Sequence, residues 1–241
     1  MVFKETITKR ILEDFANYRP PYEGEYYPSQ LWRCLRQQYY ERVYPVLKVD
    51  QNFGSMLLGT KIHDMIAEIL KKEPGVYVES EVPLRIPHPE DPEIVISGRA
   101  DDVILVRVGR QRYVLEVKTI ENLKDAVKDG RVPKLEHRAQ LNVYLRAYPK
   151  SLGVLLYIDR SDFSMEEFVF EFDEELYRKT LERAKRLHEA LKARVVPEPE
   201  AKLNKAMQWY CKYCNFSIQC DRDQSSPRGP ATEGLKSAKQ R

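Results

Sequence analysis

The alternation of hydrophobic and polar positions predicts a chain of mixed helices and strands. Apolar residues three or four positions apart are typical of amphipathic helices. The helices predicted in this way cover residues 29–45, 59–72, 136–148 and 174–194. Runs rich in β-branched and aromatic residues, bounded by Gly or Pro, favour strands instead. The predicted strands cover residues 76–87, 96–108, 111–119, 153–160 and 166–173.

The order of these elements predicts the fold class. Helix, helix, strand, hairpin, helix, hairpin, helix is typical of an α/β domain whose mixed central sheet is flanked by helices. The first hairpin turns around Gly109, and a Pro-rich linker at residues 195–205 follows the last helix.

Composition divides the chain into four predicted segments. Residues 1–50 form an N-terminal helical segment, residues 51–195 the α/β core, and residues 196–222 a separate C-terminal segment. Residues 223–241 are rich in Ser, Pro, Gly and charge, which predicts a disordered tail.

Hydropathy and charge indicate whether the chain is a soluble or a membrane protein and whether it could bind nucleic acid. Hydrophobic residues make up 42% of the chain, enough for a sizeable core, and a net charge of +3 argues neither for nor against nucleic acid. Basic residues gather at 31–48 and 118–150, where they could neutralise phosphates, although such runs are more often solvated faces. With no signal peptide and no apolar run of ~20 residues, we expect a soluble, cytoplasmic protein with reduced thiols and no membrane contact.

The strand "YVLEVKT" at residues 113–119 carries charge on a face that its apolar residues would otherwise bury. Glu116 and Lys118 point to the same side, and a lone pair of this kind is usually an ion pair at the edge of a sheet. If the hairpin loop spans residues 108–111, Asp101 lies across from Lys118 and diagonal to Glu116. The two carboxylates would then suit a hard divalent cation. A loop one residue longer or shorter would place Asp102 there instead, so the turn alone leaves the register open.

Three further polar residues stand at helical positions. His63 borders the apolar stripe of its helix, and by itself is typical of a histidine at the edge of a core. Gln140 and Tyr144 are four residues apart, so their side chains share one face of a helix.

Taken in order, these motifs resemble a known family. "GTKIH", "GRADD", "EVK" and "QLNVY" resemble the RecB-like branch of the PD-(D/E)XK nuclease superfamily, over most of residues 29–220. The resemblance implies a restriction-endonuclease-like core with a mixed sheet. It also implies cleavage of DNA with the help of a divalent metal ion.

The resemblance further implies a role for each matching residue. The implied metal ligands are His63, Asp101, Glu116 and the backbone carbonyl of Val117, and an imidazole among carboxylates suits Mn²⁺ at least as well as Mg²⁺. Lys118 would orient or help to deprotonate the attacking water and stabilise charge on the phosphate. Gln140 and Tyr144 would hold the scissile strand.

The cysteines form a second cluster. The C-x₂-C-x₅-C spacing of Cys211, Cys214 and Cys220 is a strong metal-binding signal, whereas Cys34 alone could be an ordinary buried thiol. "PSQLWRCLRQQYY" and "CKYCNFSIQC" resemble the CRISPR-associated exonucleases of the RecB-like group, and the one-plus-three arrangement also occurs in AddB-type nucleases. The resemblance implies a [4Fe–4S] cluster that joins residues 1–50 to an iron–sulfur segment at residues 196–222. Both [2Fe–2S] and Zn²⁺ remain alternatives, although zinc usually prefers two spaced pairs.

The function implied by the resemblance is a metal-dependent exonuclease on single-stranded DNA. It implies 5′ to 3′ cleavage with some endonuclease activity, in CRISPR spacer acquisition beside the CRISPR integrase. A repair or replication nuclease of the same superfamily is one alternative. A non-catalytic module that binds DNA ends or docks the integrase is another. The sequence leaves open whether the chain forms a homo-oligomer.

Overall fold

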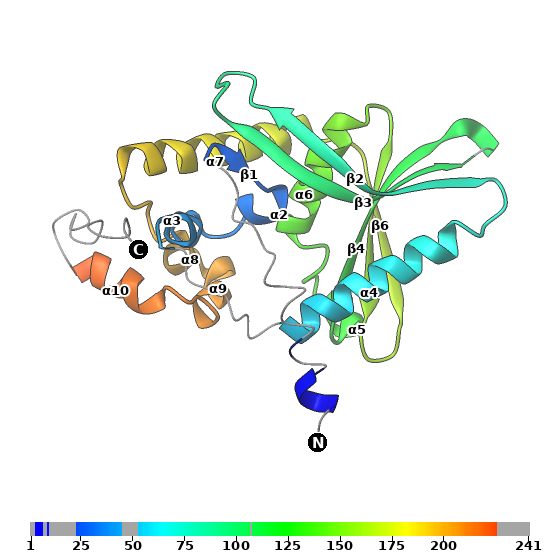
Figure 1. Ribbon diagram of the computed structural model, residues 1–241, viewed down its shortest axis with the longest axis horizontal. Coiled ribbons are helices and arrows are strands. Elements are labelled where there is room, and N and C mark those ends of the chain that lie inside the picture. The colour runs from blue at the N-terminus through cyan, green and yellow to red at the C-terminus, as the bar shows by residue number, and fades with distance from the viewer. Residues whose placement is uncertain (1–2, 7–8, 10–22, 45–52, 107, 226–241) are drawn as a thin grey trace.

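The computed structural model describes residues 3–6, 9, 23–44, 53–106 and 108–225. Within these ranges a six-stranded mixed sheet forms the centre of the molecule, with helices on both faces (Figure 1). This architecture confirms the α/β fold class. None of the helices in the described ranges is long and apolar enough to cross a membrane.

The sheet runs in the order β1-β3-β4-β5-β6, with β2 paired to β3 on its other side. The parallel pairs are β1 with β3 and β4 with β5, and the remaining pairs are antiparallel. Both predicted hairpins are present. The strands are β1 (Glu25–Tyr26), β2 (Val76–Pro87), β3 (Val95–Val106), β4 (Arg112–Ile120), β5 (Leu152–Asp159) and β6 (Met165–Phe170).

Alternation along the strands divides the core between the two faces. On β4, Leu115 and Val117 pack with Ile62 and Ile66 of α4 (Phe53–Leu70), the helix that covers one face. Val114 belongs to the larger cluster on the other face, under α6 and α7 (Figure 1). Glu116 and Lys118 therefore point toward the α6 side. The helices on that side are α2 (Pro28–Leu31), α3 (Leu35–Val43), α6 (Leu135–Ala147) and α7 (Glu174–Ala193).

The helix predicted over residues 29–45 is wrong at its centre. The chain breaks between α2 and α3, because Arg183 of α7 donates hydrogen bonds to the carbonyl oxygens of Leu31 at 2.6 Å and Arg33 at 2.8 Å. Trp32 also donates to Thr180 Oγ1 of α7 at 2.8 Å. These tertiary contacts take up the backbone oxygens on either side of the break, and Cys34 becomes the N-cap residue of α3. Residue 45 lies outside the described residues.

The C-terminal segment folds back onto the N-terminal one. Phe216 and Cys220 join the main core, and the Phe216 ring lies 5.5 Å from the Tyr40 ring of α3 between centroids. Figure 1 shows α9 and α10 beside α3 and α8. The helices of this segment are α8 (Glu200–Leu203), α9 (Trp209–Lys212) and α10 (Ser217–Ser225).

Several short helices fall where the sequence predicted irregular chain. The predicted linker contains α8, and α5 (Leu123–Lys128) follows β4. The predicted tail begins at residue 223, but α10 continues to Ser225. The rest of that tail, residues 226–241, lies outside the described residues.

Candidate active site and cysteine centre

The register of the β3–β4 hairpin decides which aspartate faces Glu116. The strands pair from Leu105 with Arg112 to Asp102 with Leu115, and continuing this register places Asp101 opposite Glu116. The predicted pairing of Asp101 with Lys118 is therefore wrong by two residues. The turn closes earlier than assumed because Gly109 and Arg110 both have positive φ, at 76° and 51°. A shift of two keeps every side chain on its predicted face, so Asp101 and Glu116 still share one.

Asp102 points to the opposite side of the sheet. Its carboxylate accepts a hydrogen bond from Ser80 Oγ of β2 at 2.6 Å, and it is buried. Burial raises the pKa of Asp102, and the charge of Asp101 adds to this effect. Of the two neighbouring aspartates, Asp101 is the one that belongs to the polar site.

Asp101 connects β3 to both β4 and α4. His63 Nδ1 of α4 lies 3.3 Å from Asp101 Oδ2, and the backbone N–H of Val117 donates to the same oxygen at 2.9 Å. Burial opposes the charge of Asp101, but the His63 contact and Lys118 outweigh it and lower the pKa of Asp101. Burial likewise opposes a charged His63, and Asp101 outweighs it and raises the pKa of His63. Each side chain thus favours the charged form of the other, and His63 would have to release its proton before it could act as a metal ligand.

Glu116 is the most deeply buried acid of the site, with 1% of its surface exposed. Its Oε1 accepts hydrogen bonds from Lys118 Nζ and from Gln140 Nε2, the latter at 2.7 Å. Among the described residues, its Oε2 has no hydrogen-bond partner. Burial and the neighbouring Asp101 raise the pKa of Glu116 to about 7. A buried carboxylate oxygen without a partner is costly, which marks this atom as a position for a ligand.

Lys118, Gln140 and Tyr144 complete the polar network. Gln140 Oε1 accepts from Lys118 Nζ at 3.3 Å, while Gln140 Nε2 also donates to the Tyr144 hydroxyl at 3.1 Å. Burial opposes the charge of Lys118, but Glu116 and Asp101 outweigh it and raise the pKa of Lys118. Burial and the charge of Glu116 raise the pKa of Tyr144 well above its usual range. The structure therefore brings all of the predicted active-site residues together.

Gly98 was missed by the sequence analysis, although it belongs to the motif "GRADD". A β-carbon at this position would lie 3.2 Å from the Tyr144 hydroxyl oxygen and 3.3 Å from Pro28 Cδ. Glycine thus lets Tyr144 approach β3 closely. An isolated glycine within a predicted strand was the available signal.

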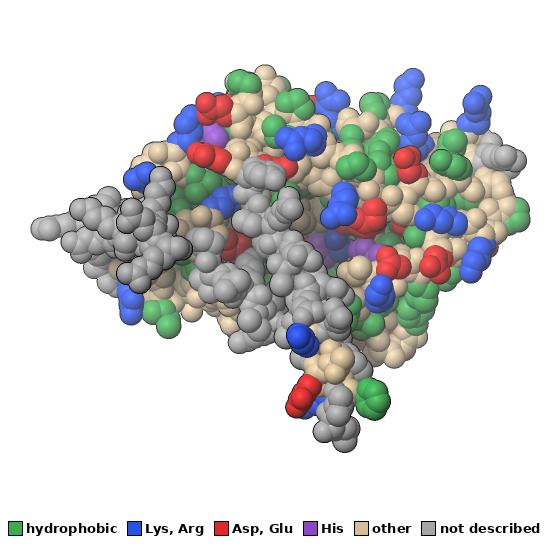
Figure 2. Space-filling view, viewed as in Figure 1, with side chains coloured by type: hydrophobic (Ala, Val, Ile, Leu, Met, Phe, Trp, Pro, Cys, Tyr) green, Lys and Arg blue, Asp and Glu red, His purple; other side chains and the backbone are tan. Residues whose placement is uncertain are grey.

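A histidine beside the site was also missed. His137 lies one helical turn before Gln140, and its Nδ1 is 2.8 Å from the Tyr157 hydroxyl. Burial lowers the pKa of His137 well below its usual range, and the charges of Lys118, Lys134 and Arg33 lower it further. Figure 2 shows acidic, basic and histidine side chains side by side near the centre of this face of the molecule.

The donor set of this site suits a hard divalent cation. Asp101 and Glu116 offer carboxylate oxygens, one of them without a partner in the part of the chain that the structure describes, and His63 adds an imidazole nitrogen. Across the described ranges, no three His, Cys, Asp or Glu side chains already surround a single point at ligating distances. The fit therefore rests on the chemistry of the donors and on the orphaned oxygen of Glu116.

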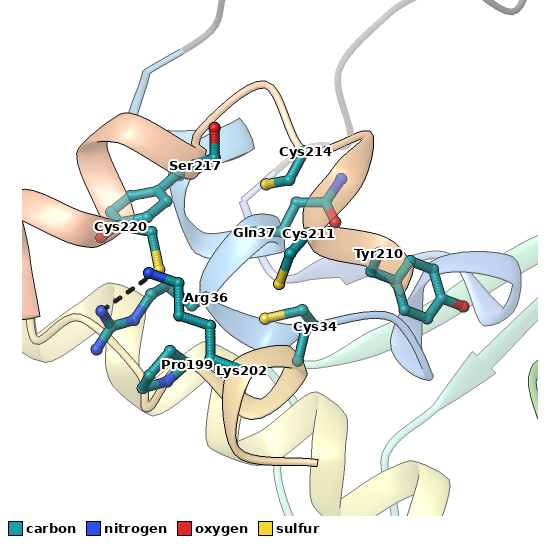
Figure 3. Close-up of a pocket in the computed structure, with 12 residues that line it drawn as sticks. Cys34, Arg36, Gln37, Pro199, Lys202, Tyr210, Cys211, Cys214, Ser217 and Cys220 are labelled. Carbon is teal, nitrogen blue, oxygen red and sulfur yellow. Dashed lines mark hydrogen bonds between the residues drawn. The ribbon is translucent and has the colours of Figure 1, made fainter. Parts of the chain in front are cut away.

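The four cysteines line one pocket between α3 and the helices α8, α9 and α10, here called the cysteine pocket (Figure 3). None of them forms a disulfide. Burial raises the pKa of Cys211 and of Cys214, and the nearby thiols of Cys34 and Cys220 raise both further. Deprotonation of one cysteine thus disfavours deprotonation of its neighbours, as expected for four thiols that line one pocket.

Basic side chains border the cysteine pocket. Arg36 Nη1 lies 3.7 Å from Cys220 Sγ, Arg36 is 8% exposed, and Lys202 also lines the pocket. Positive charge at this place would offset the charge of several thiolates. The residues present thus suit a metal group held by cysteine sulfur.

The fold agrees with comparisons to known proteins. A family model described as the PD-(D/E)XK nuclease superfamily matches residues 10–221. The CRISPR-associated exonuclease Cas4 of Saccharolobus solfataricus is 28% identical over 217 residues, which cover 90% of this chain and 96% of that protein.

Two solved structures have a similar fold. The crystal structure of SSO0001 superposes with a TM-score of 0.62 at 26% identity, covering 91% of this chain and 96% of that one. An alkaline exonuclease from Laribacter hongkongensis superposes with a TM-score of 0.50 at 16% identity, covering 78% and 95%. At that identity the second likeness concerns the fold alone.

Proposed function

The chain belongs to the PD-(D/E)XK nuclease superfamily, and from this premise we propose that it is a metal-dependent deoxyribonuclease that acts on single-stranded DNA. The observation that carries this proposal is the buried Glu116, whose free oxygen lies in a network with Lys118 and Gln140 on the face shared with Asp101. Similarity to a CRISPR-associated exonuclease supports an exonuclease in a CRISPR context. We further propose 5′ to 3′ cleavage with some endonuclease activity, in spacer acquisition beside the CRISPR integrase, as the resemblance of the sequence motifs implies.

The proposed metal ion is Mn²⁺ or Mg²⁺. Its ligands would be Asp101, Glu116, His63 and the carbonyl oxygen of Val117. When bound, such an ion supplies a Lewis acid and lowers the pKa of water at the scissile phosphate. Asp101 is already oriented by the N–H of Val117 and by His63. The raised pKa of Glu116 means that it must release a proton near neutral pH before its second oxygen can act as a ligand.

Lys118 and Gln140 act beside these carboxylates. Glu116 and Gln140 fix the Lys118 ammonium, where it would orient the attacking water and stabilise charge that develops on the phosphate. Tyr144 braces Gln140 from one helical turn further along α6. Gln140 and Tyr144 would in addition hold the scissile strand.

The proposed activity is tested on single-stranded DNA labelled at either its 5′ or its 3′ end. Cleavage with Mn²⁺ or Mg²⁺ that stops on addition of EDTA is expected, with mononucleotides or short products released from the 5′ end. Cleavage of duplex DNA in preference to single strands would contradict the substrate assignment. Binding without cleavage under all metal conditions would favour the non-catalytic alternative.

The cysteine pocket is proposed to hold a [4Fe–4S] cluster, with [2Fe–2S] and Zn²⁺ as alternatives. The free thiols of Cys34 and of the C-terminal cysteines, together with the neighbouring Arg36, support a thiolate-bound group. The resulting iron–sulfur segment would be residues 196–222, with Cys34 contributed by the segment of residues 1–50. Hydrolysis needs no electron transfer, so this group would stabilise the fold.

Replacing Lys118 is expected to affect turnover more than binding. Lys118→Ala should lower the cleavage rate by roughly 10²-fold or more, because it removes a positioned charge at the reacting phosphate. The rate and the affinity for DNA are measured separately, the latter in EDTA. Lys124→Ala is the matched control, since Lys124 is exposed and pairs with Asp162. Unchanged turnover with weaker DNA binding would reduce Lys118 to a phosphate contact.

A substitution at Gly98 tests whether the close packing of Tyr144 against β3 is needed for stability and activity. Gly98→Val should displace Tyr144 and, with it, Gln140, at a cost of about 1–3 kcal/mol of stability. We expect a rate loss of at least roughly tenfold, because the displaced groups no longer orient Glu116. Denaturant unfolding and initial rates measure the two effects. Gly54→Ala is the control, because nothing described lies within 4 Å of its added carbon. A Gly98→Val chain with unchanged stability and rate would show that this packing is not needed.

A further inference from the structure

An aromatic pair marks the start of α9. The rings of Trp209 and Tyr210 are stacked, with centroids 3.9 Å apart and planes 25° apart. The Tyr210 hydroxyl donates to Glu136 Oε1 of α6 at 3.2 Å, which anchors this ring. Trp209 is 44% exposed. The pair thus presents a braced, flat surface that solvent can reach.

A basic side chain accompanies this ring. Lys134 Nζ lies 5.2 Å from the centre of the Trp209 ring, and the backbone N–H of Lys134 donates to the Tyr157 hydroxyl at 3.0 Å. The backbone of Lys134 is therefore fixed, while its long side chain can move its ammonium group between the ring and a nearby anion. A flat aromatic surface next to a cation is the combination that recognises a base together with its phosphate.

The position of this pair relative to the active site follows from α6. Lys134 is the N-cap residue of α6, and Gln140 lies six residues further along it. At 1.5 Å per residue this separation is about 9 Å along the helix axis. His137 lies between them, and Arg33, Lys118 and Lys134 are the cations whose charge acts on it. A cation thus stands at each end of this stretch, Lys134 at the aromatic pair and Lys118 in the network around Glu116.

We propose that Trp209, backed by Tyr210, and Lys134 form a platform for single-stranded DNA, on which one base displaces Lys134 Nζ from the face of Trp209 and stacks there while Lys134 pairs with an adjacent phosphate. The platform rests on the function proposed for the neighbouring site and would hold the strand close to the scissile bond. Stacking on an aromatic ring tolerates every base, so the platform would hold a strand without selecting its sequence. A ring that only packs α9 against α6 is the competing role.

Binding measured in EDTA isolates the platform from cleavage. The probes are labelled oligothymidylate and an abasic oligonucleotide of the same length. Trp209→Ala should weaken the binding of oligothymidylate by roughly 5- to 150-fold, the equivalent of about 1–3 kcal/mol for one stacked base. Its effect on the abasic strand should be small. Trp209→Phe should retain most of the affinity, and Lys134→Ala should weaken both strands and flatten the salt dependence.

Two controls separate stacking from damage to the fold. Tyr213→Ala removes a ring that is 71% exposed in the same segment, and it should leave the binding unchanged. In the unaltered chain, oligothymidylate should quench the fluorescence of Trp209, and the abasic strand should not. The other tryptophan, Trp32, packs under Arg183 and donates to Thr180, so it should contribute little to the change.

The results of these experiments test the platform separately from the proposed nuclease activity. Equal binding of oligothymidylate by the unaltered chain and by Trp209→Ala would overturn the platform, even where DNA is cleaved normally. Equal losses for the thymidylate and abasic strands would also overturn it, because the ring would then matter only for packing. Base-dependent binding and quenching without cleavage under any metal would support the platform while the proposed nuclease activity failed.

Discussion

Asp101→Asn is expected to lower the rate of DNA cleavage by at least about 10³-fold while the chain stays folded. The substitution removes the charge of a carboxylate that faces Glu116 and His63, so a divalent cation would lose several kcal/mol of binding or of charge stabilisation. The fold should survive because asparagine can still accept the hydrogen bond from the N–H of Val117. The substitution also removes the repulsion between the carboxylates of Asp101 and Glu116, which favours the folded chain.

Asp102→Asn is the matched control for this substitution. Asp102 is the adjacent acid, but its carboxylate bonds to Ser80 on the opposite side of the sheet. Initial rates on 5′-labelled single strands and the affinity for Mn²⁺ should both stay close to those of the unaltered chain. An inactive Asp102→Asn beside an active Asp101→Asn would mean that the strands pair one residue out of the register described here.

The main elements of the fold could be predicted because their periodicity is long and consistent. Both hairpins and the helices α4, α6 and α7 each repeat their apolar pattern over many residues. The break between α2 and α3 could not be predicted, since it depends on hydrogen bonds from Arg183, which is distant in sequence. Short helices such as α8 contain too few residues for a pattern to emerge.

The candidate active site was predictable as a set of residues but not as a geometry. Alternation along β4 placed Glu116 and Lys118 on one face, and the error of two residues in register left that face unchanged. The orphaned oxygen of Glu116 depends on side chains from β4 and α6 meeting in three dimensions. The contact of Lys134 with Trp209 likewise depends on where the C-terminal segment folds back, which no local pattern reports.

For the cysteines, too, one part of the site could be predicted from the sequence and another part could not. The spacing of Cys211, Cys214 and Cys220 indicated a metal site by itself, whereas Cys34 was assigned from resemblance. The structure brings Cys34 into the same pocket because α3 packs beside the C-terminal helices through Tyr40 and Phe216. That a metal group binds there, and which one, stays a prediction, and substitution of the cysteines tests it.

Replacing any one of the four cysteines by alanine is expected to remove the bound group and to destabilise the chain. The purified protein should be brown if it holds an iron–sulfur cluster, and each variant should lose this colour, because a cluster that lacks one thiolate is usually lost or labile. The melting temperature should fall by at least about 10 °C, since binding of such a group is largely folding free energy and 1 kcal/mol corresponds to about 2–4 °C in a chain of this size.

Ser217→Ala is the control for the cysteine variants, because Ser217 lines the same pocket without offering a thiolate. Cleavage activity should fall in proportion to the loss of folded protein and no further, since Asp101 and Glu116 lie on β3 and β4, outside the cysteine pocket. A colourless protein that contains zinc and depends on the same four cysteines would identify the bound group as Zn²⁺. The four ligands would then stay as proposed. A Cys34→Ala chain with unchanged colour, melting temperature and activity would instead remove Cys34 from the ligand set, because a true fourth ligand could not be lost without loosening the contact between α3 and α10.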